Sequence, residues 1–156
     1  MSEALRRVYE EEGLLKYYFD KDVPRDLFRG QSKTEAKQGL PILYPNPGFT
    51  PKGKPPRLPD VEIVEVNGKK IVKGCRTTRG DYRGISTFDR KIPNLGGFTW
   101  YQLPKATPIP EALAITQDSD YADRPNHFTV APKDDMPLEL FQVWLDALNK
   151  HLTKDA

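Results

Sequence analysis

The alternation of apolar and polar residues is clearest over residues 61–74, where VEIVEV and IVKG flank the dipeptide Asn67-Gly68. A period of two is typical of a strand with one covered face, and Asn-Gly is the preferred dipeptide of a two-residue hairpin turn. Shorter runs of strand-forming residues follow at 98–104, 112–116 and 127–132. The central part of the chain therefore predicts short strands in mostly antiparallel order.

A helical period replaces this alternation near the end of the chain. From Pro137 onward, apolar residues recur at intervals that place them on one helix face, namely Leu138, Phe141, Trp144, Leu145, Leu148 and Leu152. We expect Asp134 or Asp135 to cap this helix. Residues 2–12 predict a second, charged helix that stops at Gly13. Strands between two terminal helices predict an α+β fold, and we expect residues 1–156 to form a single domain.

The first third of the chain is less regular. The run LLKYYF at residues 14–19 can continue the first helix or form a strand, whereas Leu27 and Phe28 predict a short strand that ends in a turn at Arg29-Gly30. Seven prolines then lie between Leu40 and Pro59. Apolar anchors interrupt them (Ile42, Leu43, Tyr44 and Phe49), so we interpret this stretch as an ordered wrap rather than a flexible linker.

The charge of the chain is nearly balanced, with 24 basic and 22 acidic residues, but it is unevenly distributed. Residues 52–91 carry a net charge of +6 and residues 92–156 a net charge of −4. The basic part can approach a phosphate-bearing ligand or nucleic acid, or it can face the acidic part of the same chain. Cys75 is the sole cysteine, which excludes an internal disulfide and a cysteine metal cluster.

Few side chains are candidates for chemistry. The phosphate-binding and nucleophile motifs GxxxxGK[ST], GxGxxG and GxSxG are absent, and no clustered histidines, cysteines or carboxylates predict a metal site. Ser86 and Thr87 are adjacent, so on a strand one hydroxyl would face a cleft while the other bonds backbone inside, although a turn or a helix cap remains an alternative. His127 opens an apolar strand directly after a polar loop.

Taken in their order along the chain, these weak signals resemble a known fold. An arginine strand (LFRG, 27–30), a Ser-Thr strand (GISTFD, 84–89) and a late strand opened by a polar residue (HFTVAP, 127–132) resemble the ADP-ribosyltransferase fold. With LPKATPIPEALAITQDS (103–119) and MPLELF (136–141), most of residues 25–150 resembles the small toxins of the type VI secretion exported-effector-two family.

That resemblance implies two small antiparallel sheets that form a cleft, with NAD as the ligand. It implies a toxin that modifies an intracellular target and arrests growth, and a cognate immunity protein as partner. The charged N-terminus is not typical of a cleaved signal peptide and no segment is long enough to span a membrane. We therefore expect a cytoplasmic location in the producing cell and in the target cell, with any secretion proceeding without a cleaved signal.

The resemblance also suggests roles for individual residues. Arg29 would pair with the pyrophosphate or the adenosine ribose, and Gly30 would permit close approach of the ligand. Ser86 would bind a nicotinamide ribose hydroxyl or orient the third site residue, His127, while Thr87 braces the strand. Tyr101 or Trp100 would stack on nicotinamide, with core packing as the alternative role of either ring.

One position departs from the family pattern. ADP-ribosyltransferases typically place a glutamate near the start of the late strand, but RPNHFTV contains none, and His127 occupies that position. A neutral imidazole accepts a hydrogen bond without contributing negative charge to an oxocarbenium-like transition state. Asp118 or Asp120, in the preceding loop, is the second choice for a carboxylate.

A second hypothesis is a non-catalytic binding module, or an RNA-directed enzyme similar to the 2′-phosphotransferases, on the same scaffold. It relies on the basic residues of the central region, which are Arg76, Arg79, Arg83, Arg90 and Lys91. Binding of this kind weakens steeply with salt.

Overall fold

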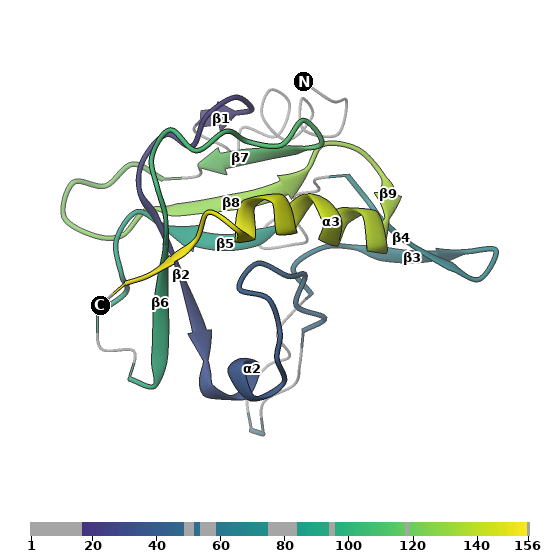
Figure 1. Ribbon diagram of the computed structural model, residues 1–156, viewed down its shortest axis with the longest axis horizontal. Coiled ribbons are helices and arrows are strands. Elements are labelled where there is room, and N and C mark those ends of the chain that lie inside the picture. Colours follow the sequence, from purple (N-terminus) through teal and green to yellow (C-terminus); the bar gives the residue numbers. More distant parts are fainter. Residues whose placement is uncertain are drawn as a thin grey trace.

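The larger of two sheets forms the body of the molecule. The computed structural model describes residues 17–48, 52–53, 59–74, 84–93, 96–117 and 119–155. Within them, seven strands pair antiparallel in the spatial order β1-β7-β8-β5-β2-β6-β10 (Figure 1). Their bounds in that order are Tyr17–Phe19, Leu113–Gln117, His127–Pro132, Ile85–Phe88, Leu27–Ser32, Phe98–Leu103 and Thr153–Lys154. The antiparallel order and the three late strands are confirmed.

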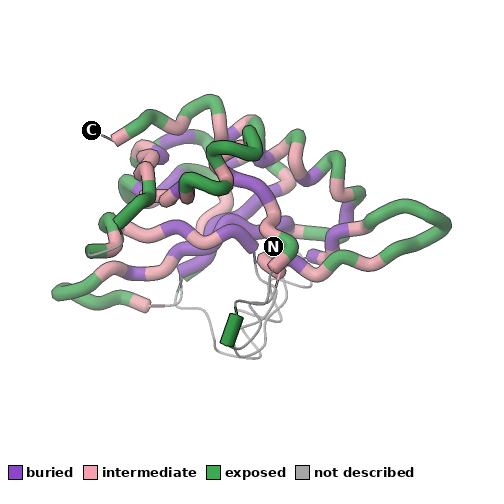
Figure 2. The backbone as a smooth tube through the Cα atoms, turned by 90° about the horizontal axis from the view of Figure 1, so that it is seen from below, coloured by how far each residue is buried: buried purple, intermediate pink, exposed green. Residues whose placement is uncertain are grey.

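The second sheet is small. It comprises β3 (Ile63–Val66), β4 (Lys69–Val72) and the two-residue strand β9 (Met136–Pro137). Between β3 and β4, Asn67 has φ 51° and Gly68 has φ 76°. Positive φ at both turn positions is the conformation for which Asn-Gly is selected, so the predicted hairpin is confirmed. It extends away from the rest of the chain, and its tip is exposed (Figures 1 and 2).

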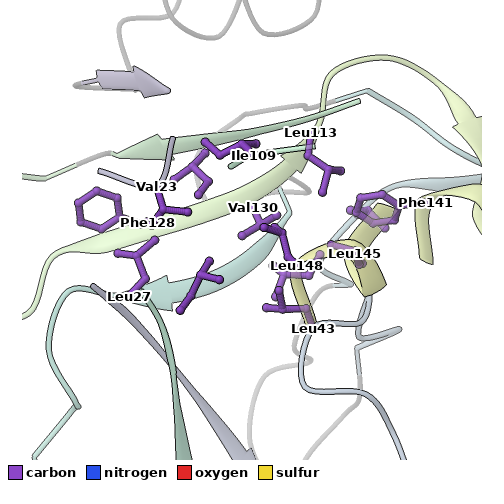
Figure 3. Packing of buried hydrophobic residues seen from close by; sticks show 14 of the residues in the cluster. Val23, Leu27, Leu43, Ile109, Leu113, Phe128, Val130, Phe141, Leu145 and Leu148 are labelled. Carbon is purple, nitrogen blue, oxygen red and sulfur yellow. The ribbon is translucent and has the colours of Figure 1, made fainter. Parts of the chain in front are cut away.

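The helix α3 (Leu138–Asn149) covers the core beside the larger sheet. Its fully buried residues Phe141, Leu145 and Leu148 belong to one cluster with Val130 of β8 and Leu43 of the proline-rich segment (Figure 3). The helix and its apolar face therefore follow the predicted period. Leu43 is held to α3 by its backbone as well, because its N–H donates to Asn149 Oδ1 at 2.8 Å. Residues 40–48, the longest part of the predicted wrap that the structure describes, are thus held to α3 through Leu43.

The predicted cap of this helix is wrong. Pro137 is the N-cap residue, and no side chain caps the helix. Because β9 pairs with β4 immediately before α3, Asp135 is held at the end of β4, where its carboxylate accepts the Gly74 N–H at 2.7 Å and pairs with Lys73.

The predicted end of the first long strand is also wrong. β2 does not turn at Arg29-Gly30 but continues to Ser32, because all six of its residues pair with β6, from Leu27↔Leu103 to Ser32↔Phe98. The short helix α2 (Lys33–Lys37) follows at once. Ser32 caps it, with its hydroxyl accepting from the Glu35 N–H while the Glu35 carboxylate accepts from the Ser32 N–H. This reciprocal capping box fixes Glu35 beside the end of β2.

The α+β class is confirmed, with one correction to its details. Two small antiparallel sheets were expected, but the sheets have seven and three strands, so only the second is small. Of LLKYYF, residues 17–19 form β1. The predicted helix over residues 2–12 and the anchor Phe49 lie outside the described residues. Among the residues that the structure describes, no helix has the length and apolar character needed to cross a membrane.

Candidate functional site

The site begins where two neighbouring strands of the larger sheet diverge. β2 and β5 are joined by a single residue pair, Phe28↔Phe88, whereas β2 pairs with β6 along its whole length. Continued antiparallel pairing would place Gly30 opposite Ser86. The strands instead separate, and the Ser86 carbonyl needs another donor.

Arg29 supplies that donor. Its Nη1 donates to the Ser86 carbonyl at 2.9 Å, and its Nε donates to the Ile42 carbonyl at 3.4 Å. The guanidinium therefore spans the gap between β2, β5 and the proline-rich segment. These two bonds leave further N–H donors on the same planar group, which suit a phosphate or another oxyanion.

Ser86 and His127 meet on one face of the sheet. The register pairs Ser86 with Thr129 and Phe88 with His127, which makes Ser86 and His127 diagonal neighbours across β5 and β8. Ser86 Oγ and His127 Nε2 lie 2.8 Å apart, within hydrogen-bond distance. The His127 ring also packs against Phe88, with ring centroids 5.5 Å apart. Two residues named from the sequence are thus brought into direct contact.

Thr87 points the opposite way, as strand alternation requires. It is 1% exposed, and its Oγ1 donates to the Phe128 carbonyl at 3.1 Å. From the sequence we expect one hydroxyl of the pair to face a cleft while the other bonds backbone inside. Ser86 and Thr87 follow this expectation. Thr87 supports the strand and does not touch the cavity described next.

A cavity of about 230 Å³ opens beside Arg29 and Ser86. Its described lining comes from β2, β5, β6, α2 and neighbouring loops, and includes no residue of the three-stranded sheet: Arg29, Gly30, Glu35, Asn46, Ser86, Phe88, Ile92, Phe98 and Trp100. The cavity therefore lies against the larger sheet. The cleft between two sheets that the resemblance implies stays a prediction.

Aromatic rings form one wall of this cavity. Trp100 is paired with Gly30 in the β2–β6 ladder, and a Cβ at Gly30 would lie 3.4 Å from the Trp100 ring and 3.2 Å from the Phe98 ring. The absence of a side chain at Gly30 thus lets the rings lie over the strand. Tyr101, the other predicted stacking residue, is the next residue of β6 and so faces the opposite side of the sheet from Trp100.

Glu35, which was not among the residues predicted from the sequence, brings a carboxylate to the cavity. Its Oε2 accepts the Tyr44 hydroxyl at 2.6 Å, and its Oε1 accepts the Ser32 N–H at 2.9 Å. Burial raises the pKa of Glu35, but the hydrogen bonds from Tyr44 and Ser32 together with the nearby Arg29 charge outweigh burial, and the net pKa lies below its ordinary value. The carboxylate is therefore ionised at neutral pH.

The neighbours of Glu35 keep it in place. Burial is the main reason that the pKa of Tyr44 is raised, and the hydrogen bond to Glu35 adds to it, so the phenol remains a donor. Asn46 donates through Nδ2 to the Tyr44 oxygen at 3.2 Å and also lines the cavity. The sequence signal for this group was the Ser-x-x-Glu spacing of residues 32–35, which is typical of a capping box and places Glu35 directly after the arginine strand.

The remaining candidates lie elsewhere. Asp120 forms an ion pair with Arg25 at 3.6 Å and is not part of the described cavity lining, and Asp118 lies outside the described residues. Of the basic residues proposed for RNA binding, Arg76, Arg79 and Arg83 are also outside that part of the chain. Arg90 donates to the Ala122 carbonyl at 2.8 Å, and Lys91 pairs with Asp155.

Metal ligands do not gather in the described part of the chain, where no group of three or more His, Cys, Asp or Glu side chains is placed to hold an ion. The described side chains of the site offer a guanidinium, a carboxylate, a Ser–His pair and an aromatic wall.

Comparison with known proteins identifies the family. The model of the Tse2 ADP-ribosyltransferase toxin family matches residues 5–156, which is nearly the whole chain. The chain therefore belongs to this family, and the resemblance seen in the sequence is confirmed. A search of curated proteins found no match.

Proposed function

We propose that this member of the Tse2 ADP-ribosyltransferase toxin family binds NAD and uses it to modify an intracellular target, which arrests growth. Membership of a toxin family is given by the match over residues 5–156. The observation that carries the proposal is the 2.8 Å contact of His127 with Ser86, a residue that lines the same cavity as Arg29.

The residues of the cavity fit the parts of a dinucleotide. The remaining N–H groups of Arg29 suit the pyrophosphate, because a planar guanidinium pairs well with phosphate oxygens. The rings of Trp100 and Phe98, which are tilted 38° to each other, offer aromatic faces to a base. When bound, NAD supplies an ADP-ribose group, whose bond to nicotinamide is the bond to be broken.

His127 and Ser86 act together on a ribose in this proposal. With Nε2 unprotonated, His127 accepts the Ser86 hydroxyl hydrogen, which leaves the Ser86 oxygen free to accept a hydrogen bond from a ribose hydroxyl. Fixing the sugar in one orientation lowers the barrier, since less freedom is lost on reaching the transition state. Arg29 keeps Ser86 in position by holding its carbonyl.

Growth after induced expression tests the proposal. The native chain should arrest growth, and Ser86→Ala and His127→Ala should each relieve the arrest while soluble yield is unchanged. His151→Ala is the matched control, because His151 is exposed just beyond α3 and should leave the arrest intact. Full toxicity of both site variants would show that Ser86 and His127 are not the functional pair.

The place of action and the partner can be tested in the same cells. We expect arrest when the chain is retained in the cytoplasm and continued growth when it is exported to the periplasm. A cognate immunity protein, a partner inferred from the family, should restore growth when it is co-expressed. Rescue by an unrelated protein of the same size would contradict this inference.

A further inference from the structure

Glu35 is a charged residue of the described cavity to which the proposed function assigns no task. We propose that Glu35 is a specificity-determining residue whose carboxylate accepts hydrogen bonds from the adenosine ribose of NAD and repels the 2′-phosphate of NADP. The inference rests on the NAD binding proposed above, and it identifies the form of dinucleotide that the cavity accepts.

The positions of three side chains orient the ligand. Arg29 hydrogen-bonds the Ser86 carbonyl, and Arg29, Ser86 and Glu35 all line the same cavity. With the pyrophosphate at Arg29 and one ribose at the Ser86–His127 pair, the other half of the dinucleotide extends toward Glu35. The second ribose, which belongs to adenosine, then lies nearest the carboxylate.

The carboxylate is held as an acceptor. Tyr44 donates to one oxygen and the Ser32 N–H to the other, and each oxygen keeps a lone pair for a ligand. Because Tyr44 is itself fixed by Asn46, and Ser32 by the start of α2, the Glu35 side chain has little freedom to swing away. The lowered pKa described above keeps the negative charge present at neutral pH.

The ionised Glu35 carboxylate can distinguish NAD from NADP both by charge and by hydrogen bonding. The ribose 2′-hydroxyl of NAD can donate to the carboxylate, as acidic residues accept from this hydroxyl in other dinucleotide sites. The 2′-phosphate of NADP carries no such donor at neutral pH and brings negative charge to a carboxylate that is already ionised. Placing like charges together opposes binding.

Isothermal titration calorimetry of the full chain with NAD and with NADP measures this selection directly. The native chain should bind NAD about tenfold or more tighter than NADP, since like-charge contacts at an interface are costly. Glu35→Gln should lose most of this preference, because glutamine can still complete the capping box while the charge is removed. Glu111→Gln is the matched control: it removes an equal charge from an exposed turn, and the preference for NAD should remain.

The ligand can be changed instead of the protein. NAD that lacks the adenosine 2′-hydroxyl should bind the native chain about tenfold more weakly, because the carboxylate loses its donor. This measurement tests the proposed contact with the adenosine ribose even where Glu35→Gln fails to fold.

The outcomes separate the inference from the function on which it rests. Equal binding of NAD and NADP by the native chain, or an unchanged preference in folded Glu35→Gln, would overturn the role of Glu35 and leave NAD binding in place. Equal binding of NAD and its 2′-deoxy analogue would do the same. A native chain that binds neither dinucleotide would overturn both proposals.

Discussion

Asp89 and Asn126 hold together the ends of β5 and β8, one residue beyond the pair Phe88↔His127. Asp89 Oδ1 accepts the Asn126 N–H at 2.7 Å, and Oδ2 accepts Asn126 Nδ2 at 2.9 Å, while the Asp89 N–H donates to the Asn126 carbonyl at 3.2 Å. Asn126 is completely buried and directly precedes His127. This contact therefore fixes the point at which the functional strand begins.

Asp89→Asn should lower the free energy of unfolding by about 2 kcal/mol, because it weakens charge-assisted hydrogen bonds and can turn an amide toward the donors of Asn126. Urea unfolding measures the loss. Asp123→Asn is the matched control, since the Asp123 side chain is 75% exposed and its removal should change stability little. Equal midpoints for the two variants would show that the buried contact contributes no more than a surface charge.

Two threonines on adjacent strands should respond differently to replacement by valine. Thr87 donates to the Phe128 carbonyl, whereas Thr129 is 1% exposed and its hydroxyl has no hydrogen-bond partner within the described structure. Thr87→Val should destabilise the protein by about 1 kcal/mol, and Thr129→Val should be neutral or stabilising, because it replaces an unsatisfied buried hydroxyl with a methyl group. Thermal unfolding of both variants gives the comparison. A larger loss in Thr129→Val than in Thr87→Val would contradict the bonding pattern.

Gly84→Ala should prevent normal pairing of β5 with β8. Gly84 has φ 150°, and a Cβ there would lie 2.1 Å from the Val130 carbonyl oxygen, closer than any real contact. We expect a loss of several kcal/mol, about 3 or more, or failure to fold, because backbone has to move in the centre of the sheet. Circular dichroism and soluble yield measure it. Gly96→Ala, where an added Cβ meets nothing within 4 Å, is the control and should fold normally.

The Glu35–Tyr44 pair predicts a pH dependence of stability at both ends of the scale. Because the pKa of Glu35 is lowered from 4.5 by folding, its ionised form stabilises the native state above that value, and this contribution is lost as pH falls through the lower native pKa. Because the pKa of Tyr44 is raised from 10.0, its protonated form stabilises the native state below that value, and the contribution is lost as pH rises above it. Unfolding midpoints measured across pH should therefore fall less steeply at acid pH in Glu35→Gln and less steeply at alkaline pH in Tyr44→Phe. Parallel curves for variants and native chain would show that the pair is not linked to folding.

The local sequence pattern was sufficient to predict several parts of this structure. The Asn67-Gly68 hairpin follows from the dihedral angles that its turn requires, and α3 follows from the spacing of Phe141, Leu145 and Leu148. The opposed directions of Ser86 and Thr87 follow from strand alternation alone. Each of these depends on residues close together in the chain.

The predictions from sequence were wrong where pairing with a distant segment outweighed a local structural preference. Arg29-Gly30 reads as a turn until six pairs with β6 extend the strand through it. Asp135 reads as a helix cap until the pairing of β9 with β4 directs it to Gly74 and Lys73. Hydrogen bonds to a neighbouring strand outweigh a weak local propensity in both places.

The sequence by itself determined the strands, the main helix, the family resemblance and the identity of Arg29, Ser86 and His127 as candidates. Only the tertiary structure decided that β2 and β5 diverge after one pair, so that Arg29 bridges the gap, and that the capping box turns Glu35 into the cavity. The reason is physical: alternation and helical period fix which way a side chain points from its own element, but the order of strands in a sheet depends on contacts between residues far apart in the chain.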